Sequence, residues 1–175
     1  MRDPAALSGR TDLPDGVRVD ETSSVTPEFA RFLYAMVGGP WRWTDRLGAP
    51  LATRVWAMIE TPMAVVNAAE IAGAARDVDG RLAALVIGPN DLLKASRIRP
   101  PGWAALMPWL MTVLAAARAY EIEAIDGVFT DLADAAGFEA ECVQGRDLGF
   151  DGKMLIHPSQ IGPANAAFGP DAAEI

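Results

Sequence analysis

The sequence has few of the residues from which many common sites are built. Among its 175 residues there is one cysteine, Cys142, and one histidine, His157. A single cysteine excludes an internal disulfide and a cysteine-rich metal site, and it fits a reducing compartment. One histidine excludes His-rich zinc sites, and a Ser-His-Asp triad would have to run through His157.

Basic residues are scarce relative to acidic ones. Fifteen Lys and Arg oppose 23 Asp and Glu, which gives a formal net charge of −8. Such a surface repels phosphates on average, so we expect no nucleic-acid partner. No apolar run approaches the roughly 20 residues of a membrane span, and the first residues lack the apolar core of a signal peptide. We therefore expect a soluble, cytoplasmic protein with no membrane partner.

Short apolar segments alternate with helical patterns from about residue 51 onward. Four strands are predicted at residues 54–59, 83–88, 123–129 and 153–156. Their apolar runs are continuous, which is typical of parallel strands buried on both faces. Helical patterns follow each strand and begin near Pro62, Asn90, Trp103, Asp134 and Pro158. Four such repeats predict four βα units.

Four units are half of the number in a complete βα barrel, which needs eight units and about 250 residues. The sequence therefore predicts either a small open α/β sheet or half a barrel over residues 51–175. Half a barrel has open sheet edges and an exposed inner face, which a partner or the N-terminal segment must cover. Residues 1–50 are expected to form a separate extension: a Pro- and Gly-rich lead, an amphipathic helix over 27–36, and a segment with Trp41 and Trp43.

Polar residues gather where the predicted strands end. Glu60 follows the first strand, Asp91 the second, Asp126 lies in the third, and His157 follows the fourth. In parallel α/β folds this edge is where ligands bind. Two carboxylates at the ends of neighbouring strands repel unless they share a cation or a proton. Oxygen ligands in small number suit Mg²⁺, and zinc is disfavoured.

Each of these residues also has an ordinary structural interpretation. Glu60 and Asp91 are equally explained as acids favoured by the positive ends of helices, or as an N-cap at Asp91. Asp126 with Gly127 is typical of a turn or strand-end cap. His157 before Pro158 can satisfy a backbone carbonyl, and Lys153 can extend its amine to solvent. Spacing alone leaves these alternatives open.

Several segments together resemble a known family. VWAMIETPMAVVNAAEIA, LAALVIGPNDLLK and GKMLIHPSQI, with the sequence between them, resemble the HpcH/HpaI aldolase and citrate lyase β-subunit family over residues 50–175. The similarity is greatest to the CoA-ester lyase branch, which includes malyl-CoA and citramalyl-CoA lyases. The resemblance implies a partial TIM barrel corresponding to strands five to eight, and Mg²⁺-dependent cleavage or formation of a carbon–carbon bond between an acyl-CoA and an α-keto acid.

The resemblance also implies roles for individual residues. Glu60 of the ETP motif and Asp91 of the GxxDL motif match the family's metal ligands and so its catalytic centre. The segment Gly88, Pro89 and Asn90 is expected to bind the substrate carboxylate through backbone N–H groups. Lys153, His157 and Gln160 match a segment near the CoA thioester. A CoA ester and an α-keto acid are thus the expected ligands, and Mg²⁺ the cofactor.

The sequence departs from the family in what it does not contain. The first four strands, an arginine that clamps the keto acid, and a C-terminal lid with an acid/base aspartate have no counterpart. Residues 13–48 instead resemble the opening of bacterial GNAT N-acetyltransferases, although they are too short for an acetyl-CoA site. The alternative is therefore a non-catalytic truncated or chimeric fragment. In either case we expect a homo-oligomer or association with a complementary N-terminal half.

Overall fold

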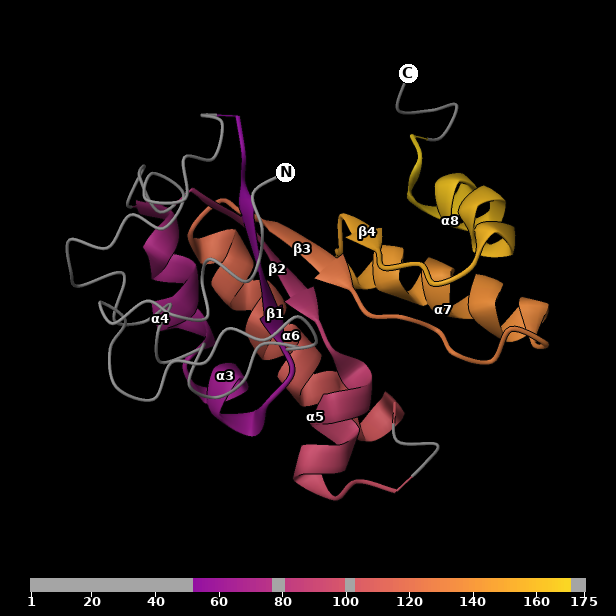
Figure 1. The fold of residues 1–175 in the computed structure, drawn as a ribbon, viewed down its shortest axis with the longest axis horizontal. Coiled ribbons are helices and arrows are strands. Elements are labelled where there is room, and N and C mark those ends of the chain that lie inside the picture. Colours follow the sequence, from indigo (N-terminus) through magenta and orange to yellow (C-terminus); the bar gives the residue numbers. More distant parts are fainter. Residues whose placement is uncertain (1–51, 77–80, 100–102, 171–175) are drawn as a thin grey trace, which may run out of the picture.

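The computed structural model describes residues 52–76, 81–99 and 103–170 (Figure 1). The helix predicted at 27–36, the two tryptophans after it and the proposed boundary near residue 50 lie outside these residues. The described elements are β1 (Val55–Ile59), α3 (Pro62–Val66), α4 (Ala68–Gly73), η2 (Ala74–Arg76), β2 (Leu82–Ile87), α5 (Pro89–Ser96), α6 (Trp103–Ala119), β3 (Glu123–Asp126), α7 (Ala135–Leu148), β4 (Gly152–Lys153), η3 (Pro158–Gln160) and α8 (Ile161–Phe168). Every predicted strand and helix of this region is therefore present.

The four strands form one parallel sheet in the order β1-β2-β3-β4. β3 ends at Asp126 although a strand to Phe129 was predicted, and β4 has two residues although four were predicted. Side-chain hydrogen bonds to main-chain groups replace the backbone pairing of β3 and β4 before the predicted ends of these strands. The carboxylate of Asp126 accepts the N–H of Gly127 at 2.8 Å, and Gln160 bonds to the main chain beyond both strands.

Capping residues set the helix boundaries. The hydroxyl of Thr61 accepts the N–H of Ala64 at 3.1 Å, and the carboxylate of Asp134 accepts the N–H of Gly137 at 2.8 Å. Both are N-cap interactions, and they lie where the sequence predicted that helices begin. The predicted helix after Pro62 is divided into α3 and α4, because Asn67 departs from helical geometry with φ −100° and ψ 15°.

The helices that the structure describes cover one face of the sheet. Side chains of this face from the first three strands are buried in one core with α4 and α6: Ala57, Ile59, Leu85, Ile87 and Ala124. Because side chains alternate along a strand, Asp126 lies on the same face as Ala124. A Cβ on Gly145 of α7 would lie 3.0 Å from the Asp126 carboxylate, so α7 covers this face too.

Sequential strand order with helices on a single face is the arrangement of a barrel, since a doubly wound sheet places helices on both faces. The opposite face corresponds to a barrel interior. On it, Trp56 of β1 is 56% exposed. The chain therefore contains four consecutive βα units of a TIM-barrel-like fold, as the sequence predicted.

None of the helices in the described ranges has both the length and the apolar character needed to cross a bilayer.

Candidate functional site

Glu60 stands at the carboxyl end of β1, in close contact with the end of β2. Its side chain is almost fully buried, with 3% exposure. A Cβ on Gly88 would lie 2.5 Å from the Cβ of Glu60, a distance that real Cβ atoms do not show. The N–H of Gly88 donates to the carbonyl of Ile59 at 3.0 Å. Gly88 is therefore the residue that lets the two strand ends approach with a carboxylate between them.

The same close packing continues to the end of β3. Pro89 is buried, and a Cβ on Gly127 would lie 2.5 Å from its ring carbon Cδ. The ends of β1, β2 and β3 are thus held together by two glycines and one proline ring.

Asp91 lies in the first turn of α5, the helix that begins directly after Gly88. Both Asn90 and Asp91 are exposed, and no side chain caps this helix. The N–H of Gly88 is already bonded and Pro89 has no N–H, so only Asn90 and Asp91 can present backbone donors here. Substrate binding by this segment stays a prediction; within the segment, Gly88 and Pro89 set the path of the backbone, and Asn90 and Asp91 carry the N–H groups that would face an anion.

These residues suit Mg²⁺ chemically. Glu60 and Asp91 carry carboxylates directly after β1 and in the first turn of α5, which follows β2, and Gly88 allows the Glu60 side chain to pack against the end of β2. Among the residues that the structure describes, no three His, Cys, Asp or Glu side chains converge as a metal-binding group. Mg²⁺ takes one or two protein carboxylates and completes its shell with water and substrate, so two ligands are sufficient.

Substitution of Gly88 tests this packing. We expect Gly88→Ala to displace Glu60 and to weaken Mg²⁺ binding, because the new methyl group would occupy the position of the Glu60 Cβ. Gly162→Ala in α8 is the matched control, since nothing lies within 4 Å of a Cβ there. Calorimetric Mg²⁺ titration of both variants measures the difference. Equal affinities would show that the close contact at Gly88 does not hold Glu60 in place.

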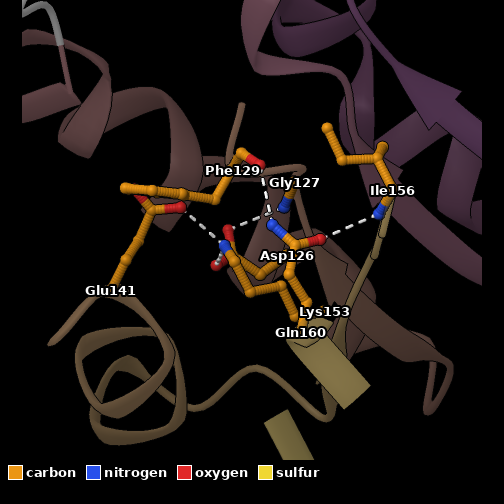
Figure 2. A network of polar contacts seen from close by, with 7 residues as sticks. All are labelled: Asp126, Gly127, Phe129, Glu141, Lys153, Ile156 and Gln160. Carbon is orange, nitrogen blue, oxygen red and sulfur yellow. Dashed lines mark hydrogen bonds and ion pairs between the residues drawn. The ribbon is translucent and has the colours of Figure 1, made fainter. Parts of the chain in front are cut away.

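Asp126 does not belong to this carboxylate pair, because it is bonded to a buried lysine. The Nζ of Lys153 lies 2.7 Å from Asp126 Oδ2 and 2.6 Å from Glu141 Oε1 (Figure 2). The side chains of Lys153 and Asp126 are fully buried, and that of Glu141 is 16% exposed. Lys153 pairs with Asp126 in the sheet, so both point toward α7 and away from the barrel interior.

Burial raises the pKa of Asp126 and of Glu141 above their ordinary values, and the Lys153 ammonium only partly offsets it. Two carboxylates share one ammonium, so the fully ionised cluster has an excess negative charge in a region of low dielectric constant. Burial also raises the pKa of the Cys142 thiol, which is fully buried nearby and therefore unreactive.

The three residues predicted to lie near CoA have different surroundings. The Lys153 ammonium contacts carboxylates inside the protein, and Gln160 is 4% exposed with its amide bonded to main-chain groups. His157 is exposed, and its Nδ1 accepts the N–H of Ser159 at 3.2 Å. Contact with CoA remains a prediction for all three, and His157 is the one whose side chain is open to a ligand.

Sequence reasoning missed Glu141 and the cluster that it completes. One signal for the cluster was present. Side chains alternate along β3, so Asp126 lies on the same buried face of the sheet as Ala124, and a buried acid requires a partner. The partner itself was not identifiable, because Glu141 and Lys153 are separated along the chain and meet only when α7 packs on the sheet.

The chain is similar to known proteins over most of its length. The HpcH/HpaI aldolase/citrate lyase family matches residues 12–158. A (3S)-malyl-CoA thioesterase of Cereibacter sphaeroides is 49% identical over 123 residues, which are 69% of this chain and 41% of that protein. The citrate lyase subunit β of Escherichia coli is 35% identical over 127 residues, 72% of this chain and 41% of that protein. The chain thus spans about two fifths of the length of these relatives.

Solved structures show the same relationship. RipC from Yersinia pestis has a TM-score of 0.69 and 30% identity over 83% of this chain and 61% of its own. The citrate lyase β subunit of Mycobacterium tuberculosis, solved with oxaloacetate and magnesium, has a TM-score of 0.60 and 30% identity over 83% of this chain and 69% of its own. With four consecutive parallel βα units and a match that covers most of its residues, the chain belongs to the HpcH/HpaI aldolase/citrate lyase family.

Proposed function

We propose that Glu60 and Asp91 are the protein ligands of a Mg²⁺ ion in a site that cleaves or forms a carbon–carbon bond in the CoA ester of a hydroxy acid. The observation on which this proposal depends is the placement of Glu60 directly after β1 and of Asp91 in the first turn of α5, which follows the neighbouring parallel strand β2, with Gly88 directly beside Glu60. The solved citrate lyase β subunit that contains oxaloacetate and magnesium supports it.

The two carboxylates have complementary surroundings. Glu60 is buried, where a carboxylate attracts a cation more strongly than in water. Asp91 is exposed, so its side of the site remains open to water and substrate. The N–H groups at the start of α5 favour an anionic group, such as the carboxylate of a keto acid. When bound, Mg²⁺ supplies Lewis acidity to the oxygen on which negative charge develops as the carbon–carbon bond breaks.

The substrate class is a CoA ester such as malyl-CoA. Cleavage of its carbon–carbon bond gives acetyl-CoA and glyoxylate: the hydroxyl loses its proton as the bond breaks, and the enolate of acetyl-CoA takes up one proton at carbon. The arginine clamp and acid/base aspartate that the family resemblance implies have no counterpart in residues 50–175. We further propose that the chain acts in the cytoplasm together with a second copy of itself or with a complementary N-terminal half, which would supply such groups.

Thioester hydrolysis is the second candidate. It is favoured by the 49% identity to a malyl-CoA thioesterase, which exceeds the 35% identity to citrate lyase subunit β. Hydrolysis adds water across the thioester and releases malate and the free thiol of CoA, so the two reactions differ in every product.

An assay with malyl-CoA distinguishes these functions. We expect acetyl-CoA and glyoxylate to form only when Mg²⁺ is present, with light scattering on the same sample showing a mass above that of one chain. Free CoA thiol without acetyl-CoA would instead identify hydrolysis, and buried Cys142 adds little thiol background. If a chain that binds Mg²⁺ forms neither acetyl-CoA nor free CoA thiol, the remaining interpretation is a non-catalytic fragment.

A further inference from the structure

The side chain of Gln160 joins the two segments that follow β3 and β4. Its Nε2 donates to the carbonyl of Phe129 at 2.9 Å, and its Oε1 accepts the N–H of Ile156 at 2.9 Å. Figure 2 shows the carboxamide lying between these two main-chain groups. Gln160 is 4% exposed, so both bonds are shielded from water. They connect loops on the edge of the sheet where Glu60 also lies.

The two bonds continue the register of the sheet. The last pair between β3 and β4 is Asp126 with Lys153, and the N–H of Met154 donates to the carbonyl of Asp126 at 2.9 Å. Phe129 and Ile156 each lie three residues beyond that pair, so they would face each other if the strands continued. A carboxamide has the donor and acceptor types of a peptide group. Gln160 therefore replaces a missing backbone pair and separates the two segments by the width of a side chain.

The turn after Ile156 is attached to the same residue. The N–H of Gln160 donates to the carbonyl of His157 at 3.1 Å. The Nδ1 of His157 lies 2.8 Å from the hydroxyl of Ser159 and accepts the Ser159 N–H. A neutral ring that accepts at Nδ1 has its proton on Nε2. The exposed ring of His157 is thus fixed on one side and has an N–H donor on the other.

We propose that Gln160 is a positioning residue that holds the His157 turn, so that Nε2–H of His157 donates to an oxygen of the ligand, while Gln160 itself does not contact the ligand. The Asp126–Lys153–Glu141 cluster fixes the strand ends from which both bridged segments begin. The identity of the ligand, an acyl-CoA ester, rests on the proposed function. The effect of Gln160 on the turn at His157 is independent of the proposed function.

The test compares Gln160→Met, which removes donor and acceptor, with Gln160→Glu in the full chain. NMR follows hydrogen exchange of the Ile156 amide and the ring C–H signals of His157, which are unambiguous because the chain has one histidine. We expect Gln160→Met to accelerate exchange of that amide at least about tenfold and to shift the ring signals.

The glutamate variant gives a rescue that depends on pH. Its neutral carboxyl can donate to Phe129 and accept from Ile156, whereas its ionised carboxylate can only accept. We therefore expect wild-type exchange and ring signals at acidic pH, and changes like those of Gln160→Met once the carboxyl ionises. Asp126, Lys153 and Glu141 lie near this position, and His157 is the probe itself, so wild type at the same pH is the reference throughout.

A second readout separates positioning from stability alone. If malyl-CoA is turned over, its KM should rise in Gln160→Met and return toward the wild-type value in Gln160→Glu at acidic pH. Wild-type exchange and ring signals in Gln160→Met would overturn the inference, as would a glutamate variant that never recovers. Should the methionine variant not fold, the glutamate titration alone decides. Mg²⁺ binding by the wild-type chain tests the proposed function separately.

Discussion

Replacement of Glu60 by glutamine is expected to lower the affinity of the chain for Mg²⁺ by at least about tenfold, or about 1.4 kcal/mol of binding free energy. Glutamine keeps the shape of the side chain and removes the charge that a hard cation requires. Asp91→Asn should have an effect in the same direction, and the double variant should not bind Mg²⁺ measurably. Isothermal titration calorimetry on the full chain measures all three.

The control for these variants must account for the acidity of the whole protein. A net charge of −8 attracts divalent cations to the surface without any specific site. Glu139→Gln removes one exposed carboxylate from α7 and so makes the same change in net charge. Its Mg²⁺ affinity should equal that of wild type. If the Glu60 and Asp91 variants also bind as tightly as wild type, these carboxylates are not the ligands.

Lys153→Met is expected to lower the free energy of unfolding by about 3–5 kcal/mol, the usual consequence of removing one partner from a buried ion pair. The substitution leaves Asp126 fully buried without its ammonium, and only Glu141 has partial contact with water. Urea denaturation measures the change. Lys94→Met is the matched control, because Lys94 is exposed on α5 and is the only other lysine in the sequence.

A second substitution shows whether the lost stability comes from the charge. Asp126→Asn in the Lys153→Met background removes the uncompensated carboxylate, so part of the stability should return. If the double variant is no more stable than Lys153→Met, the loss comes from packing of the lysine stem and not from charge.

The pH dependence of unfolding has a defined sign for this cluster. Folding raises the pKa of Asp126 and Glu141, so the folded state binds more protons than the unfolded state between their ordinary and raised values. The contribution of these groups to the free energy of unfolding is complete at pH below their ordinary pKa values. It is lost as pH rises through their raised pKa values. Lys153→Met should enlarge this loss, since the ammonium no longer favours the ionised forms.

Local sequence signals were sufficient for the order of elements and for the positions of Glu60 and Asp91 in the fold, whereas their role as metal ligands stays a prediction. The helix starts near Pro62 and Asp134 could be predicted because capping requires only neighbours along the chain. Glu60 and Asp91 were placed at adjacent strand ends because parallel strands in sequential order bring their carboxyl ends to one edge. The first inference needs only residues that are close along the chain. The second needs only a rule of sheet topology.

The contacts of Lys153, Glu141 and Gln160 could not be inferred in this way. Lys153 was expected near CoA because its position matches a family segment, but its direction depends on which face of a two-residue strand it occupies. The bonds of Gln160 reach Phe129, which is 31 residues away along the chain. Such contacts depend on how far two strands continue before they separate, and no local pattern specifies that distance.

The fit of the Pro89 ring against Gly127 links Asp91 to a strand that it does not follow. Pro89 begins the helix on which Asp91 lies, and its ring fills the position that any larger residue at 127 would need. A sideways shift of β3 would therefore move the first turn of α5, and the carboxylate with it. The geometry of the proposed Mg²⁺ site would in this way depend on three strands, and a replacement of Gly127 would alter it without touching either acid.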